Sequence, residues 1–449
     1  MSRSRKRQST DTVSAEPLAD SELDALFAPL ADAGLITLAV SGGADSLALL
    51  DAVDRWRRRV AAAPGVLVLT VDHGLRPGSA REARAVLTVA RARGLKGRVL
   101  RWAGPRPASD IEGAARAARY RLLLRAARKA GATVLAVAHH SDDLAEGFLL
   151  RLMRGAGVFG LAAMRPRIDL GDISIVRPFL GIARARLAAT TAAARLTPVV
   201  DAMNADPRFD RARVRGVMSL LAGQGLDATL LSGAALRLAD LADAIDEAAD
   251  AVIATAVEVD DLAVARLDGA RFAAARPEVQ ARVLVRLLLA VGGDDYPPRH
   301  ERLSRLLAAM LAHGVTGSFK RTLAGAVIEG RGGRYAFWRE TGREGLPTVA
   351  LKAGRAFVYD NRFLVAPGRG LPPGLTIGPL GEAGRRQAKV RGAGPVGALI
   401  AVPAVRRKGR IASIPTLAWG DQSLPVAVRQ VVSARLVVPP LFPDLAGGR

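Results

Sequence analysis

The stretch Ser41-Gly42-Gly43-Ala44-Asp45-Ser46 combines residue types that can bind a phosphate group and a divalent cation. An apolar run at 35–40 predicts a buried strand before it, and the apolar run that follows predicts a helix. A glycine-rich turn between a strand and a helix directs backbone N–H groups toward an anion. The serine hydroxyls add donors, and Asp45 supplies a carboxylate that suits Mg²⁺. The alternative is an ordinary Gly-Gly turn with a serine N-cap.

A second group of reactive side chains lies in the sequence His139-His140-Ser141-Asp142-Asp143-Leu144-Ala145-Glu146. The histidines end a predicted strand at 133–138, and Ser141 can cap the helix that follows. Asp143 and Glu146 share a face of this helix and point back toward the loop end of the strand, where carboxylates near a triphosphate suit Mg²⁺. The structural alternative is that acids in a first turn suit the helix dipole. Zinc held by the two histidines is disfavoured, because adjacent residues rarely point at one ion.

Two further sets of polar residues lie on predicted helices. On the helix that begins at Ser109, one face carries Glu112, Arg116, Arg119 and Tyr120. The opposite, buried stripe is expected to hold Ile111, Ala115, Ala118 and Leu122. The structural alternative is a solvated face with an ion pair between Glu112 and Arg116. On a later helix, Arg151 and Arg154 precede Gly155-Ala156-Gly157 and form a basic edge that could contact RNA phosphates.

The order of the predicted elements indicates the fold class. Strands are expected at 35–40, 66–71, 97–102, 133–138 and 174–176, with helices between them. This alternation predicts an α/β fold, a doubly wound parallel sheet with helices on both faces. Ligands bind beyond the carboxyl ends of the strands in such sheets. Those ends carry the loop at 41–46, Asp72-His73-Gly74, the segment at 139–143 and Arg177-Pro178.

The rest of the chain differs in character. Residues 212–290 predict helices without strands, a further helix is expected at 299–313, and short strands are expected at 325–328 and 335–338. Frequent Gly and Pro from 342 onward indicate a small β-rich module. The predicted division is a basic disordered arm at 1–19, an α/β domain at 20–217, a helical domain at 218–320 and a β-rich C-terminal module at 321–449.

The composition favours a polyanionic partner. The 449 residues include 65 basic and 42 acidic ones, and the net charge of +23 favours nucleic acid. The alternative is a compositional habit, since arginine is abundant throughout. The absence of cysteine excludes disulfides, Cys-ligated zinc and thiol chemistry. Neither a membrane-spanning run nor a signal peptide is present, so a soluble, cytoplasmic protein without a membrane partner is expected.

The motifs carry a family resemblance. The loop at 41–46 resembles the pyrophosphate-binding loop of the N-type ATP pyrophosphatases, and the lack of a lysine after its glycines distinguishes it from P-loop NTPases. Segments at 72–82, 111–120, 138–164, 177–180 and 201–215 resemble successive motifs of the tRNA(Ile)-lysidine synthetases. Elements at 296–299 and 322–340 are similar to later family elements, and the resemblance is poor after 340. Leu144, Gly147 and Ala212 stand where the family usually has Gln, Thr and Asn.

The resemblance implies an enzyme that ligates free L-lysine to C2 of the wobble cytidine in tRNA(Ile) with a CAU anticodon. ATP would adenylate the base, and lysine would displace AMP to give lysidine. The family implies that residues 41–46 hold ATP, while Asp45 and Asp143 hold Mg²⁺. The implied catalytic residues are Asp45, Asp72, His139, Asp143, Glu146 and Arg177. The implied substrate-binding residues are Glu112, Arg116, Arg119, Tyr120, Arg151, Arg154, Asp201, Asn204, Arg211 and Arg215.

Three other functions fit parts of the sequence. A tRNA thiolase with the same type of loop needs cysteines, and the chain has none. A small-molecule amidotransferase needs an ammonia source and would not explain the net charge of +23. A non-catalytic RNA-binding protein is disfavoured by the intact carboxylates at 45, 143 and 146. No protein partner is implied, and assembly as a homodimer is left open.

Overall fold

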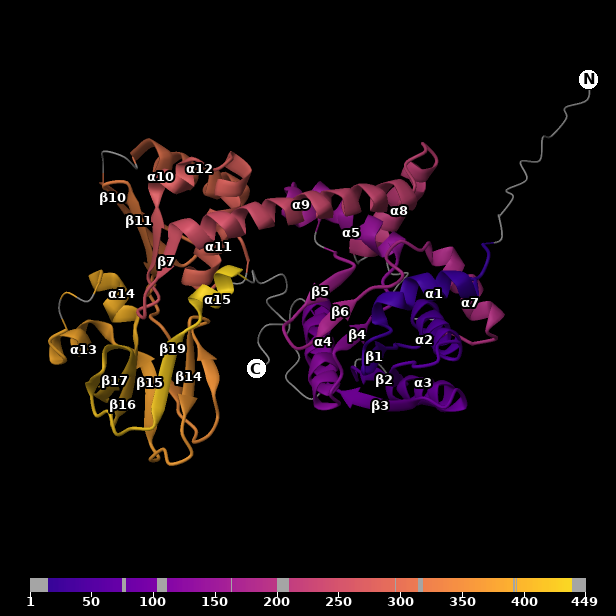
Figure 1. Cartoon of the computed structure of the whole chain (residues 1–449), viewed down its shortest axis with the longest axis horizontal. Coiled ribbons are helices and arrows are strands. Elements are labelled where there is room, and N and C mark those ends of the chain that lie inside the picture. Colours follow the sequence, from indigo (N-terminus) through magenta and orange to yellow (C-terminus); the bar gives the residue numbers. More distant parts are fainter. Residues whose placement is uncertain are drawn as a thin grey trace, which may run out of the picture. The chain divides into compact units, whose positions relative to one another are not determined.

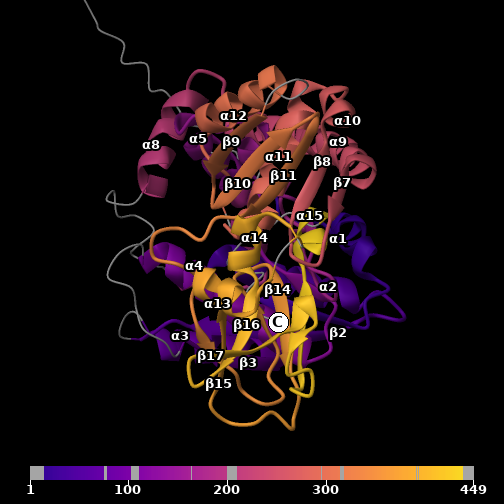
Figure 2. The same ribbon diagram turned by 90° about the vertical axis from the view of Figure 1, so that its left-hand side faces the viewer.

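The structure, a computed structural model, describes residues 15–74, 78–102, 111–162, 164–199, 210–294, 296–313, 318–390, 392 and 394–437. At 111, 112, 210–212 and 313 only the backbone is described. The described residues form two compact units, one up to Leu241 and one from Ala242 onward (Figure 1; Figure 2). No described helix is long and apolar enough to cross a membrane.

A six-stranded sheet forms the centre of the first unit, with the strand order β3-β2-β1-β4-β6-β5. The strands are β1 (Leu35–Ala39), β2 (Gly65–Asp72), β3 (Lys96–Arg101), β4 (Val134–Ala136), β5 (Arg167–Asp169) and β6 (Ser174–Val176). All neighbours pair in parallel except β5, which runs antiparallel to β6. The predicted parallel sheet is therefore confirmed. The sequence does not predict β5, because its three residues contain a single apolar side chain.

Helices cover both faces of this sheet. The helices of the first unit are α1 (Asp20–Phe27), α2 (Ala44–Arg57), α3 (Ser79–Ala92), α4 (Ile111–Lys129), α5 (Ser141–Met153), α6 (Val158–Leu161), α7 (Arg184–Ala193), α8 (Asp210–Ala222) and the first part of α9 (Ala228–Ala256), with a short 3-10 turn at Ala28–Leu30. The strand order runs one way from β1 to β3 and then reverses to β4, so right-handed connections place α2 and α3 on one face and α4 and α5 on the other. This arrangement is the predicted double winding.

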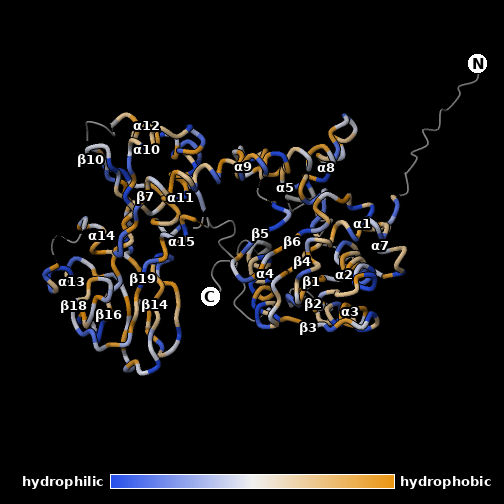
Figure 3. The backbone as a smooth tube through the Cα atoms, in the orientation of Figure 1, coloured by the Kyte–Doolittle hydropathy of each residue, from blue (hydrophilic) through white to orange (hydrophobic). Residues whose placement is uncertain are grey.

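The core of the first unit lies between α2 and the central strands. Ile36 and Leu38 of β1 are fully buried, and β1, β2 and β4 contain the hydrophobic stretches visible in Figure 3. Phe27 of α1 packs on Trp56 of α2, with ring centroids 5.4 Å apart, and on Phe179, with centroids 6.3 Å apart. Burial of these large side chains fixes α2, and with it the loop that precedes α2.

The second unit combines helices with three sheets. Its helices are the part of α9 (Ala228–Ala256) from Ala242, α10 (Gly269–Ala273), α11 (Pro277–Gly292), α12 (His300–His313), α13 (Gly381–Gln387), α14 (Val396–Ala401) and α15 (Val432–Val437), with a 3-10 turn at Pro415–Leu417. One sheet has the order β7-β8-β11-β10-β9, with β7 (Val257–Val259), β8 (Ala265–Asp268), β9 (Ser318–Leu323), β10 (Ala326–Arg331) and β11 (Arg334–Arg339). The other two sheets contain β12 (Val349–Ala350), β13 (Phe357–Tyr359), β14 (Phe363–Pro367), β15 (Leu375–Pro379), β16 (Pro403–Arg407), β17 (Arg410–Ile414), β18 (Trp419–Gly420) and β19 (Val426–Gln430).

The strands β7 and β8 correct one prediction. Residues 212–290 were expected to be helical throughout, yet β8 pairs with β11 from Asp268–Arg334 to Ala265–Phe337. The partner strand lies far along the chain, so a local sequence pattern does not show it. The strands expected at 325–328 and 335–338 are confirmed as β10 and β11. The boundary predicted at 320/321 falls within this sheet, which spans 257–339, and the boundary predicted at 217/218 lies before the division between the two units at 241/242.

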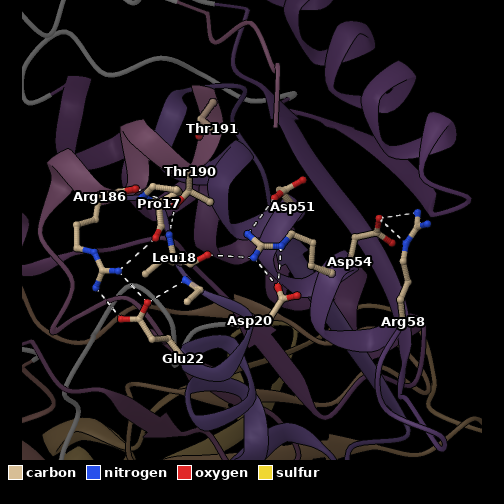
Figure 4. A network of polar contacts seen from close by, with 12 residues as sticks. Pro17, Leu18, Asp20, Glu22, Asp51, Asp54, Arg58, Arg186, Thr190 and Thr191 are labelled. Atoms are coloured by element: carbon tan, nitrogen blue, oxygen red, sulfur yellow. Dashed lines mark hydrogen bonds and ion pairs between the residues drawn. The ribbon is translucent and has the colours of Figure 1, made fainter. Parts of the chain in front are cut away.

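The segment before α1 is bound to α7. Leu18 is 1% exposed, and its N–H donates to Thr190 Oγ1 at 2.9 Å. Arg186 donates to both carboxylate oxygens of Glu22, at 2.7 and 2.8 Å (Figure 4). Residues 15–19 are therefore packed on the first unit, which corrects the prediction of a disordered arm for that part of 1–19. Residues 1–14 lie outside the described residues.

The Arg186–Glu22 pair generates a prediction about acid stability. The hydrogen bond from Arg186, together with that from the Ala19 N–H, lowers the pKa of Glu22 from 4.5 to about 2. A carboxyl group whose pKa is lower in the folded state stabilises the fold above its unfolded pKa, and this contribution is lost as the pH falls through the folded pKa. We predict that the wild-type protein has a higher free energy of unfolding than the Glu22→Gln variant at neutral pH. The difference should be modest because the ion pair is partly exposed. The difference should narrow below about pH 4.5 and vanish near about pH 2.

Urea unfolding at a series of pH values measures this difference. A difference in free energy of unfolding that stays constant from neutral to acidic pH would contradict the lowered pKa of Glu22.

Candidate functional site

The turn between β1 and α2 is held closed by its own serine. Ser46 Oγ accepts hydrogen bonds from the N–H groups of Ser41 and Gly42, each at 3.2 Å, and donates to the Gly43 carbonyl at 2.9 Å. Gly42 has a φ of +93°, which side chains of L-residues rarely allow. A Cβ on Gly42 would also lie 3.3 Å from Val86 Cγ2 and 3.4 Å from Val199 Cγ2. The backbone conformation therefore favours glycine at this position, and an added Cβ would press on Val86.

These contacts decide which N–H groups can meet a phosphate. The Gly42 N–H is directed at Ser46 and not out of the loop. The N–H groups of Gly43, Ala44 and Asp45 stand at the start of α2, where a helix supplies no acceptor of its own. Positive potential from the helix N-terminus adds to their attraction for an anion. The described loop thus offers these three donors, whereas the Ser41 hydroxyl lies 3.2 Å from Ser46 Oγ and donates to it.

Two carboxylates from different helices meet at one imidazole. Asp45 Oδ2 lies 3.6 Å and Asp143 Oδ2 lies 3.4 Å from His140 Nε2. His140 itself is 3% exposed, and its Nδ1 accepts a long hydrogen bond of 3.3 Å from the Asp143 N–H at the start of α5. Burial lowers the pKa of His140, but the hydrogen bond to Asp45 and the charges of Asp143 and Asp142 outweigh it, so the net pKa is raised. The predicted proximity of Asp45 and Asp143 is thus present in the structure.

The same cluster fits a divalent cation in part. Asp45 Oδ1 is buried without a hydrogen-bond partner, which leaves a carboxylate oxygen for a ligand. No group of three or more His, Cys, Asp or Glu side chains among the described residues forms a complete metal site. Mg²⁺ is commonly bound by one or two carboxylates together with substrate phosphates, so an incomplete protein site suits it. The two histidines have different partners, which argues against zinc between them.

Glu146 has a partner that sequence reasoning did not identify. It is 5% exposed, and its Oε1 accepts a hydrogen bond from Arg215 Nε of α8 at 2.5 Å. The Glu146 carboxylate raises the pKa of Arg215. The paired carboxylate and guanidinium carry no net charge together. Because Arg215 lies on α8 and Glu146 lies on α5, their hydrogen bond joins the two helices. The residues are far apart in sequence, and no local pattern predicts their contact.

Arg177 and His139 form a second pair at the same end of the sheet. Arg177 Nε donates to His139 Nδ1 at 3.2 Å, and Arg177 also donates to the Arg165 carbonyl at 2.6 Å. Arg177 is 3% exposed, and burial lowers its pKa, although an arginine stays charged at neutral pH. Its bond to Nδ1 requires that this nitrogen carry no proton. The neutral His139 therefore presents an N–H at Nε2.

At the end of β2, Asp72 accepts hydrogen bonds from Ser79 Oγ at 2.7 Å and from the Gly74 N–H at 3.0 Å. The bond from Ser79, with that from Gly74, lowers the pKa of Asp72, so the group is ionised. The next residue, His73, packs edge-on against Trp102 at the end of β3, with ring centroids 6.2 Å apart. Burial lowers the pKa of His73 and keeps it neutral. The sequence did not single out this aromatic pair as part of the site.

The other predicted residues are only partly brought together. Tyr120 is 4% exposed, so the alternative of a solvated face does not hold for this residue. Arg116 and Arg119 lie over its ring, at 5.4 and 5.7 Å from the centroid. Arg151 is half-buried and Arg154 is exposed. Asp201 and Asn204 lie outside the described residues, and the side chains of Glu112 and Arg211 are not described.

The conformation of the loop generates a prediction about its two glycines. Gly42→Ala should destabilise the fold by about 1–2 kcal/mol, because alanine strains a left-handed backbone. Gly43→Ala is the matched control, since its φ is −71° and the nearest atom to an added Cβ is Ser41 Oγ at 3.8 Å. Urea unfolding compares the two variants, and equal losses of stability would contradict the described loop.

Comparison with known proteins agrees with this geometry. The model of the PP-loop domain family matches residues 16–221, which include the loop, the two carboxylates and the arginine pairs. A tRNA(Ile)-lysidine synthase of Bradyrhizobium sp. is 42% identical over 331 residues, covering 70% of this chain and 92% of that protein. The enzyme of the same name from Methylobacterium nodulans is 43% identical over 340 residues, covering 74% of this chain and 99% of that protein.

A third relative extends the similarity toward the C-terminus. The tRNA(Ile)-lysidine synthase of Brucella suis is 35% identical over 412 residues, covering 87% of this chain and 88% of that protein. Residues 1–340 make up only about three quarters of the chain, so this match continues past the point where the motifs become hard to identify. Relatives this similar, matched over most of their own length, confirm the predicted resemblance, and the chain belongs to the tRNA(Ile)-lysidine synthase family of PP-loop proteins.

Proposed function

We propose that the protein ligates L-lysine to C2 of the wobble cytidine in tRNA(Ile) with a CAU anticodon, at the expense of ATP. The observation that carries the proposal is the match to enzymes named tRNA(Ile)-lysidine synthase over most of their length. The geometry supports it, because three N–H donors and two carboxylates meet where an ATP pyrophosphatase needs them.

The reaction divides into an activation and a displacement. In the activation, the C2 oxygen of the cytidine attacks the α-phosphorus of ATP, and the bond to pyrophosphate breaks. The N–H groups of Gly43, Ala44 and Asp45 would stabilise the charge that builds on the departing pyrophosphate. In the displacement, a neutral amine of lysine attacks C2. AMP leaves with the electron pair of the C–O bond, and the attacking nitrogen loses a proton. Activation is needed because the carbonyl oxygen alone is a poor leaving group.

Asp45 and Asp143 would hold a Mg²⁺ ion beside the triphosphate. When bound, the ion would neutralise part of the phosphate charge. The unpartnered Asp45 Oδ1 supports this assignment. Asp142 differs from these two, because its Oδ2 accepts a hydrogen bond from the Arg184 N–H at 2.9 Å.

The arginine pairs change the roles expected from the family. Arg177 is occupied by His139 and by the Arg165 carbonyl, so we assign it the orientation of His139 and not the binding of a substrate carboxylate. A His139 whose Nδ1 accepts from Arg177 and whose proton lies on Nε2 would be unsuited to deprotonate lysine. Glu146 is compensated by Arg215 and would not attract the lysine cation. Asp143 and Asp72 remain as side chains for that purpose, and the pKa of Asp72 is lowered by its hydrogen bonds from Ser79 and Gly74.

Binding of tRNA would depend on exposed cations, since phosphate contacts position a nucleic acid. The densest cationic run after residue 340 is 406–410, which lies in the β16–β17 hairpin, and its Arg407, Lys408 and Arg410 are exposed. Arg406 of this run donates to the Pro379 and Leu380 carbonyls and is therefore structural. We propose that the exposed part of this hairpin contributes to tRNA binding.

The proposed function predicts a double selectivity. A site that pairs the charged ends of lysine should reject norleucine, because the buried groups that pair with the side-chain amine would lose their partner. The rate of AMP formation with norleucine should be lower on the order of 100-fold or more. The base edge that is read must be that of a cytidine removed from the anticodon stack. Lysine-dependent AMP formation is measured with tRNA carrying C34 and with a U34 control. Equal rates with norleucine and lysine, or with U34 and C34, would refute the proposed ligation.

The assignment of Asp45 predicts a loss of activation. Asp45→Asn should reduce pyrophosphate release on the order of 100-fold, while the affinity for tRNA stays the same because it depends on dispersed cations. Asp142→Asn is the matched control, since Asp142 lies in the same cluster but is engaged by Arg184. Pyrophosphate release and tRNA binding are measured for both variants. Near-wild-type release by Asp45→Asn would show that this carboxylate holds no essential metal.

A further inference from the structure

We propose that Thr191 is a positioning residue for the phosphate-binding loop. Helix α7 and the segment after it, which we call the loop support (184–199), would set the direction of the loop's N–H donors. This inference rests on the proposed use of ATP and concerns residues outside the loop and the carboxylate cluster. The motifs of the sequence do not point to Thr191.

The loop support contacts two carbonyl groups of the loop. Thr191 Oγ1 donates to the Ala44 carbonyl at 2.8 Å, and the Val199 N–H donates to the Gly42 carbonyl at 2.9 Å. The Val199 side chain also closes the space beside Gly42. Both contacts join segments that are remote in sequence, so they belong to the tertiary structure and not to the turn itself.

Peptide geometry converts these contacts into control of the donors. In a planar trans peptide the C=O of one residue and the N–H of the next point in opposite directions. A fixed Gly42 carbonyl therefore fixes the direction of the Gly43 N–H, and a fixed Ala44 carbonyl fixes that of the Asp45 N–H. The remaining donor, the Ala44 N–H, follows the Gly43 carbonyl, which Ser46 Oγ and the Leu47 N–H hold at 2.9 and 3.0 Å. The loop support thus contributes to the direction of two of these donors, together with helix α2, in which the Ala44 carbonyl lies.

The loop support is itself firmly held. Thr190 and Thr191 are 1% and 2% exposed. Figure 4 shows the Thr190 hydroxyl beside Leu18, whereas the Thr191 hydroxyl donates to Ala44. Thr190 Oγ1 accepts from the Leu18 N–H and donates to the Arg186 carbonyl at 2.8 Å. The two threonines therefore match in helix, burial and chemistry, and only Thr191 contacts the loop.

This pair provides the experiment. Thr191→Val removes the hydroxyl at nearly constant shape, Thr190→Val does the same one residue away, and Thr191→Ser restores the hydroxyl. Binding of α,β-methylene-ATP is measured by calorimetry without tRNA or lysine, and stability is measured by urea unfolding. Thr191→Val should lower the affinity for the analogue about three- to tenfold, because one buried hydrogen bond is lost. Thr190→Val and Thr191→Ser should bind the analogue with an affinity within about twofold of the wild-type value, although Thr190→Val should also be less stable.

Two results would overturn the inference. Thr191→Val could bind the analogue as wild type does, or both valine variants could weaken it equally, which would show a general effect of helix α7. Either result leaves the proposed ligation intact, since that proposal is tested by lysine-dependent AMP formation. Conversely, absence of lysine-dependent turnover in a wild-type protein that binds the analogue would refute the ligation and not the role of Thr191.

Discussion

Two helix N-termini, those of α2 and α5, meet where the strand order of the first sheet reverses between β1 and β4. Ligand sites of open α/β sheets form at such reversal points because the loops on either side diverge. Here both helix starts carry acids, and both also carry the positive end of a helix dipole. That potential lowers the cost of crowding Asp45 and Asp143 around His140. The same potential is available to a phosphate group, so one electrostatic feature serves acids and anion together.

The parts of the fold that could be predicted from the sequence are those with long local signals. The apolar runs at 35–40 and 66–71 indicate β1 and β2 nearly to the residue, because central parallel strands are buried on both faces. The strands β5, β7 and β8 have three or four residues and depend on distant partners, so their formation is decided by pairing and not by local preference. The loop at 41–46 was predictable because its glycines and serines act within six residues.

The contacts that define the roles of site residues were less predictable. Glu146 and Arg177 were predicted to be functional residues, but their side-chain partners come from other segments. Pairing changes what a charged group can do, since a compensated carboxylate no longer attracts a cation. The same holds for arginine throughout the chain: Arg286 and Arg362 are each 1% exposed and bind carbonyl and carboxylate oxygens. The net charge of +23 therefore overstates the number of cations that can contact RNA.

The burial of Leu18 sets a limit on how far the amino-terminal end can be trimmed. Arg186 uses the Glu16 and Pro17 carbonyls as acceptors, and Thr190 accepts from the Leu18 N–H. A protease cut beyond Leu18 would remove a side chain from the core and leave polar groups of α7 without partners. Residues 15–18 thus behave as an integral strap of the first unit, although no helix or strand includes them.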